Sequence, residues 1–178
     1  QRVDHVLAEA IAAVHPSLVI SIERGTDAVY ALVVSAQADP RLRVYTDAWM
    51  AAAPHPDSTW EFHDAIPPVP DPTQVTLSLR GEQYPLGEVR VAPQADPAAG
   101  LIDVAVHHPG FSGLDEAAKD ALTFMPLDAA LGERLAADRI GRVESADTEP
   151  QGAIGLLEFR DLVRDWDPDA DSAGSPES

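Results

Sequence analysis

The stretch that decides the fold runs from Asp115 to Glu144 and reads DEAAKDALTFMPLDAALGERLAADRIGRVE. Its apolar residues recur at intervals of three and four, which is the spacing of one helix face. Gly132 suits a left-handed helix cap, and a short strand is expected over residues 139–145. The stretch therefore predicts a long helix beside a sheet. The residues expected in its buried stripe are Leu114, Ala118, Ala121, Leu122, Met125, Leu127, Ala130 and Leu131.

Pro126 lies inside this helical pattern. A proline within a helix cannot donate the hydrogen bond to the carbonyl four residues earlier, here that of Leu122. We therefore expect a kink at this position.

Helices and strands alternate in the first third of the chain. Three-and-four spacing predicts helices over residues 3–14 and 41–52. Apolar–polar alternation predicts strands over 18–23 and 59–66, and a hairpin partner over 28–36. The apolar residues of the second helix that share one face are Val44, Ala48 and Ala51.

A proline-rich segment, Pro67-Pro68-Val69-Pro70-Asp71-Pro72, follows these elements. Four prolines in six residues cannot join a strand ladder or a helix, so residues 67–72 are expected to be a stiff connector and a subdomain boundary. The rest of the chain predicts strands over 74–80, 89–92 and 101–107, and, after the long helix and its strand, a last short helix from Leu156 to Trp166.

These elements predict an α+β fold with a mainly antiparallel sheet and helices packed on it. The order of elements is consistent with two helix-plus-sheet halves joined by the connector. We expect one domain over residues 1–164. Residues 165–178 are acidic, small and proline-containing, which predicts a disordered tail.

The chain is strongly acidic, with 30 Asp and Glu against 12 Lys and Arg and a net charge of −18. Such a field repels nucleic-acid backbones and anionic lipid surfaces, so neither is an expected partner. A basic protein partner is favoured by the same field. No apolar run reaches 18 residues, and no signal-peptide pattern is visible. The absence of cysteine excludes disulfides and Cys-ligated metals and suits the cytoplasm, where we expect the protein.

Two places carry candidate metal-ligating or acid–base residues. Glu61 and His63 lie two residues apart on a predicted strand, so they share a face as a ligand pair, an acid–base pair or a solvated polar face. His107 and His108 are neighbours on a strand and point to opposite sides, so they cannot chelate one ion together. We predict no bound metal and no cofactor.

A third candidate site surrounds the Gly132 turn, where Asp128, Glu133 and Arg139 are candidate binding residues. The alternative is structural: Glu133 favours the positive start of a following helix, and Arg139 pairs with a carboxylate. Known catalytic motifs, including GxxxxGK[ST], GxGxxG, GxSxG and HExxH, are absent from the sequence, and we predict no catalytic residue.

In its sequence pattern the chain resembles a bacterial family, domain of unknown function 695. The resemblance covers roughly residues 3–146 and implies an α+β fold in a small bacterial domain, without catalytic residues to transfer. Four pieces carry it: His15-Pro16-Ser17-Leu18; residues 32–36 (LVVSA); Ala51-Ala52-Ala53-Pro54 with Trp60-Glu61-Phe62; and residues 127–133 (LDAALGE) with residues 139–144 (RIGRVE).

The sequence thus favours a non-catalytic module for protein interaction or regulation. A specific version is an inhibitor or immunity-type protein for a basic toxin or enzyme, whose binding would weaken as salt rises. The alternative is a metal-assisted hydrolase built on Glu61, His63 or His107 with a carboxylate from the Asp128–Glu133 turn. The sequence leaves the oligomeric state open.

Overall fold

The computed structural model describes residues 2–172, with the side chains of residues 6, 7 and 9–170. The chain divides into two compact units, Gln1–Pro67 and Pro68–Ser178, so the division falls between the first two prolines of the proline-rich segment. Helices combine with sheets in which antiparallel pairs outnumber parallel ones, which confirms the predicted α+β class. Within the described residues, no helix is both long and apolar enough to cross a lipid bilayer.

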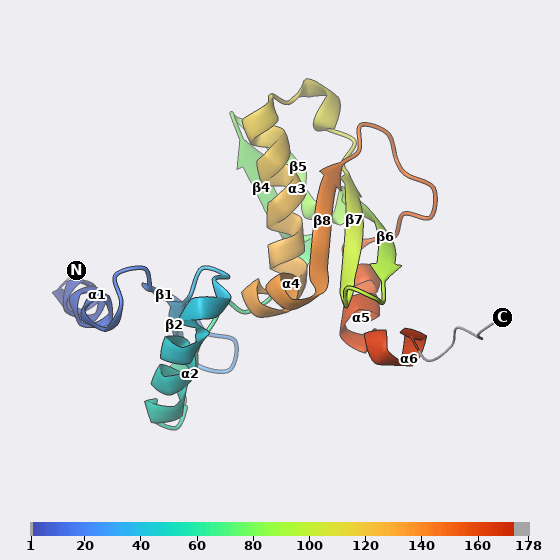
Figure 1. Cartoon of the computed structure of the whole chain (residues 1–178). Helices are drawn as coiled ribbons and strands as arrows, with labels where there is room; N and C mark the ends of the chain where they lie inside the picture. The colour runs from blue at the N-terminus through green and yellow to red at the C-terminus, as the bar shows by residue number, and fades with distance from the viewer. Residues whose placement is uncertain (1, 173–178) are drawn as a thin grey trace. The chain divides into compact units, whose positions relative to one another are not determined.

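Unit 1 contains the helices and strands that the periodicity predicts (Figure 1). In chain order they are α1 (Arg2–Val14), β1 (Val19–Arg24), β2 (Tyr30–Ser35), the 3₁₀ turn η1 (Pro40–Leu42), α2 (Arg43–Ala52) and β3 (Trp60–His63). Asp39 fixes the start of η1, because its Oδ1 accepts the backbone N–H of Arg41 at 3.0 Å and Pro40 already has the required φ angle.

The sheet of unit 1 has the order β1-β2-β3 and mixes two kinds of pairing. β1 and β2 form an antiparallel hairpin, with Val19 opposite Ser35. β3 instead pairs parallel with β2, with Tyr30 opposite Trp60. A parallel neighbour requires a crossover connection, and α2 lies in that connection. The buried core of unit 1 is small: Ile11, Leu18, Val34, Ala36 and Leu42.

The buried side of α2 differs from the predicted face. Val44, Ala48 and Ala51 are all exposed, whereas Thr46 is buried and Trp49 is half-buried. Thr46 tolerates burial because its hydroxyl donates to the carbonyl of Arg43 at 3.2 Å. A face that includes a threonine cannot be found by looking for apolar residues alone.

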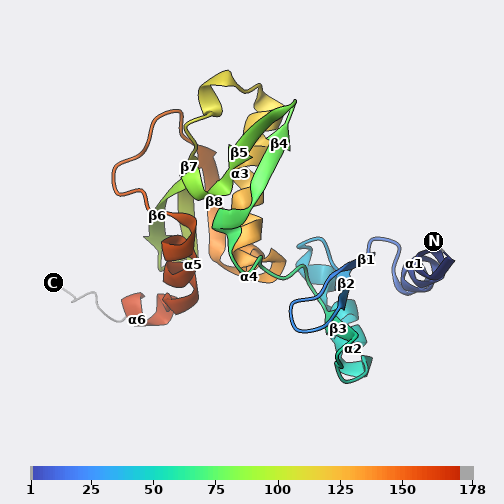
Figure 2. The same cartoon turned by 180° about the vertical axis from the view of Figure 1, so that it is seen from behind.

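Unit 2 holds the larger core and two further sheets (Figure 2). Its strands are β4 (Thr76–Leu79), β5 (Glu82–Pro85), β6 (Arg90–Asp96), β7 (Leu101–His107) and β8 (Ile140–Ser145). Its helices are α3 (Glu116–Leu131), α4 (Glu133–Arg139), α5 (Leu156–Asp165) and α6 (Pro168–Ser172), with 3₁₀ turns η2 (Pro72–Gln74), η3 (Leu86–Glu88) and η4 (Phe111–Gly113).

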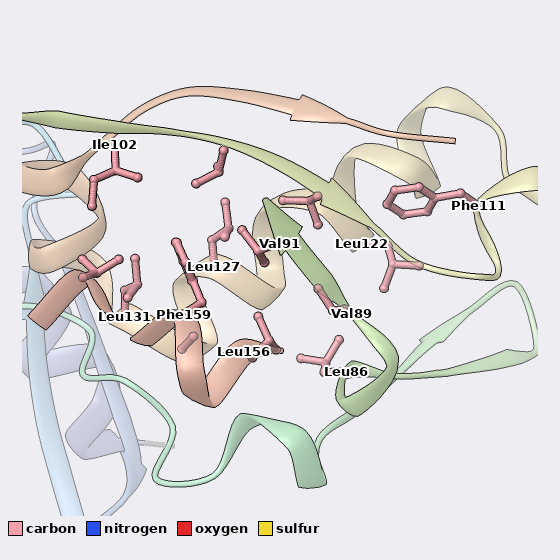
Figure 3. Close-up of a cluster of buried hydrophobic side chains, with 14 residues drawn as sticks. Leu86, Val89, Val91, Ile102, Phe111, Leu122, Leu127, Leu131, Leu156 and Phe159 are labelled. Atoms are coloured by element: carbon pink, nitrogen blue, oxygen red, sulfur yellow. The ribbon is translucent and has the colours of Figure 1, made fainter. Parts of the chain in front are cut away.

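The main sheet of unit 2 repeats the pairing of unit 1. β6 and β7 are antiparallel, and β8 pairs parallel with β7 after the crossover through α3 and α4. The buried residues of β7 alternate along the strand, so Ile102 and Val106 belong to the core while Asp103 and Ala105 lie on the opposite face. Figure 3 shows the apolar side chains packed between this sheet and the helices α3 and α5.

The helix α3 continues through Pro126. Asp115 caps its first turn by accepting the N–H of Ala118 at 2.9 Å. Gly132 follows the helix with φ 78° and ψ 166°, so its φ is positive but its conformation is not the predicted left-handed helical cap. Met125 is 49% exposed, so its predicted place in the buried stripe is wrong. The buried face of α3 instead includes Thr123 and Pro126, so it is centred on a different side of the helix from Met125. The kink stays a prediction.

Residues 69 and 70 of the proline-rich segment are fixed to unit 2. The N–H of Val69 donates to the carbonyl of Ala129 at 2.8 Å. Arg160 Nη1 donates to the carbonyls of Val69 and Pro70, both at 3.0 Å. These bonds satisfy backbone groups that proline-rich chain cannot satisfy within itself.

Two parts of unit 2 differ from the sequence prediction. The hairpin partner β5 follows the turn at Arg80 and Gly81, and the sequence analysis missed it; β6 also continues through Pro93 to Asp96. Disorder was expected from Asp165, but residues 168–172 form α6. Residues 173–178 of the predicted tail lie outside the described residues.

Candidate functional site

The structure places Glu61 in a turn-anchoring position. Its carboxylate accepts the backbone N–H groups of Thr26, Asp27 and Ala28 at 2.9, 2.8 and 2.9 Å. These three groups form the turn between β1 and β2, whereas Glu61 belongs to β3. The side chain therefore ties the β1–β2 turn to β3.

His63 completes this arrangement, because its Nε2 lies 3.0 Å from Oε1 of Glu61. The His63 hydrogen bond, followed by the N–H groups of Thr26 and Asp27, lowers the pKa of Glu61 from 4.5 to about 2. Glu61 as a residue is buried, with 8% exposure, and its carboxylate stays ionised near neutral pH. Glu61 and His63 therefore do contact each other, and the Glu61 carboxylate is used to hold the β1–β2 turn.

His107 and His108 also have backbone partners. His107 Nδ1 lies 2.9 Å from the carbonyl oxygen of Ala146. His108 is buried, its Nδ1 accepts the N–H of Gly110 at 2.9 Å, and its Nε2 therefore donates to the carbonyl of Pro85 at 3.0 Å. Among the described residues, no three His, Asp or Glu side chains are arranged to hold a metal ion.

The turn between α3 and α4 brings together two of the three predicted binding residues. Partial loss of hydration, with the nearby charge of Glu133, raises the pKa of Asp128. Glu133 is the first residue of α4, as its structural interpretation predicts, and Arg139 is the last. The Arg139 guanidinium lies 5.9 Å from the ring centre of Trp166. Arg139 is therefore at the other end of α4 from the two acids.

A different surface emerges in unit 1, on one side of its sheet. The strand registers align Arg24, Tyr30 and Trp60 in one row across β1, β2 and β3, and a second row next to it contains Ile22, Leu32 and Phe62. We call these six residues the aromatic face. Alternation along the strands puts all six on the same side of the sheet.

In the outer row of the aromatic face, Arg24 and Tyr30 are exposed and Trp60 is partly buried. The rings of Tyr30 and Trp60 lie 5.2 Å apart, and Tyr30 is 46% exposed. Trp49 of α2 packs edge-on against Phe62 with the ring centres 6.3 Å apart, so α2 covers the Phe62 end of the inner row, whereas Ile22 at the other end is 36% exposed. Tyrosine, tryptophan and arginine are the residues that most often dominate binding energy in protein interfaces.

An acidic group is fixed beside this row. Asp57 Oδ1 accepts the backbone N–H groups of Thr59 and Trp60 at 2.8 and 2.7 Å. The hydrogen bond from Trp60, and then that from Thr59, lowers the pKa of Asp57. An ionised carboxylate thus borders the aromatic face at Trp60.

The aromatic face could not be predicted from the sequence. Alternation along the predicted strand over 59–66 puts Trp60 and Phe62 on one side, but the neighbours of that side depend on which strands pair and in which register. The usable signal was the alternation of Tyr30 and Leu32 in the hairpin partner. Without the parallel pairing of β2 and β3, that signal cannot be joined to Trp60.

Comparisons with known proteins identify no relative: no family model, no curated protein and no solved structure matches the chain. The resemblance to domain of unknown function 695 therefore stays a prediction. The case for a function rests on the geometry of the chain itself.

Proposed function

We propose that the protein is a non-catalytic interaction module that binds a protein partner through the aromatic face. The observation that carries the proposal is the row of Arg24, Tyr30 and Trp60 on a regular sheet surface, in which Arg24 and Tyr30 are exposed and Trp60 is partly buried. Rigid aromatic side chains on a sheet provide a large apolar contact at a small cost in conformational entropy.

The distribution of exposed apolar side chains supports unit 1 as the binding part. Ten of the fourteen large apolar side chains that are exposed among the described residues lie in unit 1. This unit has the smaller core of the two. Two of the ten, Ile22 and Tyr30, lie on the aromatic face, and exposed apolar groups gathered on one face are typical of an interaction surface.

Charge favours a basic partner, which is the inhibitor or immunity-type version of this function. The whole chain has a net charge of −18, and unit 1 itself has nine acidic residues against four basic ones. Asp57 places one of these charges at the border of the aromatic face. A partner with apolar side chains surrounded by Lys and Arg matches this surface.

The experiment compares capture of proteins from a bacterial lysate by the wild-type chain, Tyr30→Ser and Trp60→Ser. Phe124→Ser is the matched control, because Phe124 is an aromatic residue of unit 2 with 49% exposure. We expect a partner that both unit 1 variants lose and the control retains, with circular dichroism confirming that all variants are folded. A partner retained equally by all variants, or no partner at all, contradicts the proposal.

Salt and one charge-neutral variant test the basic partner. Raising the ionic strength from about 0.1 M to about 1 M shortens the screening length from ~10 to ~3 Å, so capture is expected to fall. Asp57→Asn keeps the oxygen that accepts the N–H groups of Thr59 and Trp60, and it is expected to weaken capture without unfolding the strand. Capture that is insensitive to salt would contradict a basic partner and would leave the proposal of a partner bound through apolar contacts.

A further inference from the structure

A separate cavity of about 400 Å³ lies on the main sheet of unit 2. Its volume falls in the range of small-molecule sites. It is on the side of the sheet away from the core, because Asp103 and Ala105 of β7 line it while Ile102 and Val106 point into the core. None of the residues predicted from the sequence as site residues lines it.

The floor of the cavity consists of small residues. Ala92 of β6 lies opposite Ala105 of β7, and Ala105 lies opposite Glu144 of β8. Two adjacent alanines leave room for a molecule to approach the strands closely. Glu144 therefore stands at one end of an apolar floor.

A second row of residues places an acidic side chain, Asp103, next to the basic residue Arg142. Gln94 of β6 lies opposite Asp103 of β7, and Asp103 Oδ1 accepts the backbone N–H of Arg142 at 2.7 Å. This contact requires Gly141, because a side-chain carbon at that residue would lie 2.5 Å from the same oxygen. The register of β7 and β8 shifts at this point, which brings Arg142 next to Asp103.

A loop completes the lining with Gln151. The loop is held on one side of Gln151 by Ala146, whose N–H donates to the carbonyl of Val106 at 2.8 Å. It is held on the other side by Ile154, which exchanges two backbone hydrogen bonds of 2.8 Å with Val91. Gln151 is therefore contributed by a segment anchored at both ends.

The lining combines two carboxylates, two amides and one guanidinium. A purely anionic ligand would meet Asp103, Glu144 and the acidic field of the whole protein. A purely cationic ligand would meet Arg142, and a neutral polyol could hydrogen-bond to the charged groups but would balance none of their charges. A small molecule with both an ammonium and a carboxylate group matches all three charged side chains.

We propose that this cavity binds a free α-amino acid. Its ammonium group is held by Asp103 and Glu144, its carboxylate by Arg142, and its carbon skeleton lies over Ala92 and Ala105. The Arg142–Glu144 ion pair is loose, because the nearest charged atoms are 4.0 Å apart and both side chains are mostly exposed, so both side chains can turn toward a ligand. The inference is independent of the aromatic face, which is built from unit 1 alone.

The test is a calorimetric titration of the full chain with each of the common L-amino acids. The best-binding amino acid is then compared with its methyl ester, which lacks the carboxylate charge, and its N-acetyl derivative, which lacks the ammonium. We expect saturable binding that each derivative weakens by about tenfold or more, because each loses a charge-assisted hydrogen bond.

Charge-matched variants locate the binding. Arg142→Gln and Asp103→Asn are expected to weaken binding by about tenfold, and Asn retains an oxygen for the N–H of Arg142. The controls Arg164→Gln and Glu158→Gln change the net charge equally on exposed positions of α5 and should bind normally. The proposal is overturned if no amino acid gives saturable binding, if the ester binds as tightly as the acid, or if controls and cavity variants behave alike.

Discussion

Two substitutions on α3 distinguish the buried face in the structure from the stripe predicted by sequence. Leu122 has no exposed surface, whereas Met125 is 49% exposed one turn later. Leu122→Ala removes a side chain whose burial is worth about 1.5–3 kcal/mol, and the cavity left behind brings the expected loss of unfolding free energy to about 3–5 kcal/mol. Met125→Ala should change it by about 0.5 kcal/mol or less, as is usual at surface positions.

Urea denaturation followed by far-ultraviolet circular dichroism measures both values. A loss of about 3–5 kcal/mol is a large part of the total stability of a small domain, which is about 5–15 kcal/mol, so the Leu122→Ala midpoint should fall clearly. An equal slope with denaturant would show that both variants unfold from the same compact state. Similar losses for the two variants, or a larger loss for Met125→Ala, would refute the orientation of α3.

Three further predictions concern the candidate residues. Folding lowers the pKa of Glu61 from 4.5 to about 2, so the ionised carboxylate stabilises the fold above about pH 4.5 and this contribution is lost as pH falls toward 2. Glu61→Gln should therefore melt below wild type at pH 7, with the gap closing near pH 2; a constant gap would contradict an ionised Glu61 in the turn. His108→Ala should lower the free energy of unfolding, measured by urea denaturation, by about 3 kcal/mol, because the Gly110 N–H and the Pro85 carbonyl lose their partner. His107→Ala should lower it less, because His107 is half-exposed. Asp128→Asn should raise the melting temperature slightly at pH 7, since the raised pKa of Asp128 means that folding disfavours its charge; no gain, or an equal gain below the pKa, would contradict this.

The sequence predicts the elements of the fold better than it predicts their faces. Periodicity locates α1, α3 and the hairpin of unit 1, because these patterns are long and local. It misses β5, whose EQYP sequence has only one half-buried side chain and no alternation of apolar residues. It also misplaces the buried side of α2, since burial there includes Thr46.

The candidate sites show where local patterns stop being informative. The spacing of Glu61 and His63 correctly predicts that they share a strand face, and in the structure His63 Nε2 lies 3.0 Å from Glu61 Oε1. It cannot show that three backbone N–H groups from residues 26–28 occupy the Glu61 carboxylate, because those residues are more than thirty positions away. The aromatic face and the unit 2 cavity likewise depend on strand register, which a single sequence does not fix.

The two units have the same order of strand pairing, but the helices in their crossover connections differ in length. This difference is one reason why Tyr30 in the sheet of unit 1 is exposed. Each unit has an antiparallel hairpin, a crossover through helix, and a final strand parallel to the second. In unit 2 the crossover includes α3, whose 16 residues extend about 24 Å, and α5 packs on the same core. In unit 1 the crossover helix α2 has 10 residues and extends about 15 Å.

The shorter helix contacts Phe62 through Trp49, and Tyr30 of the outer row stays 46% exposed. If this row served only the stability of unit 1, a longer crossover that buried it would stabilise the unit further, at roughly 25 cal/mol per Å² of apolar surface removed from water. Glu61 instead fixes the turn beside the row, and Asp57 adds a charge at its border. A rigid apolar surface bordered by charge is typical of protein-binding sites, and this geometry is the physical basis of the proposal that unit 1 binds the partner.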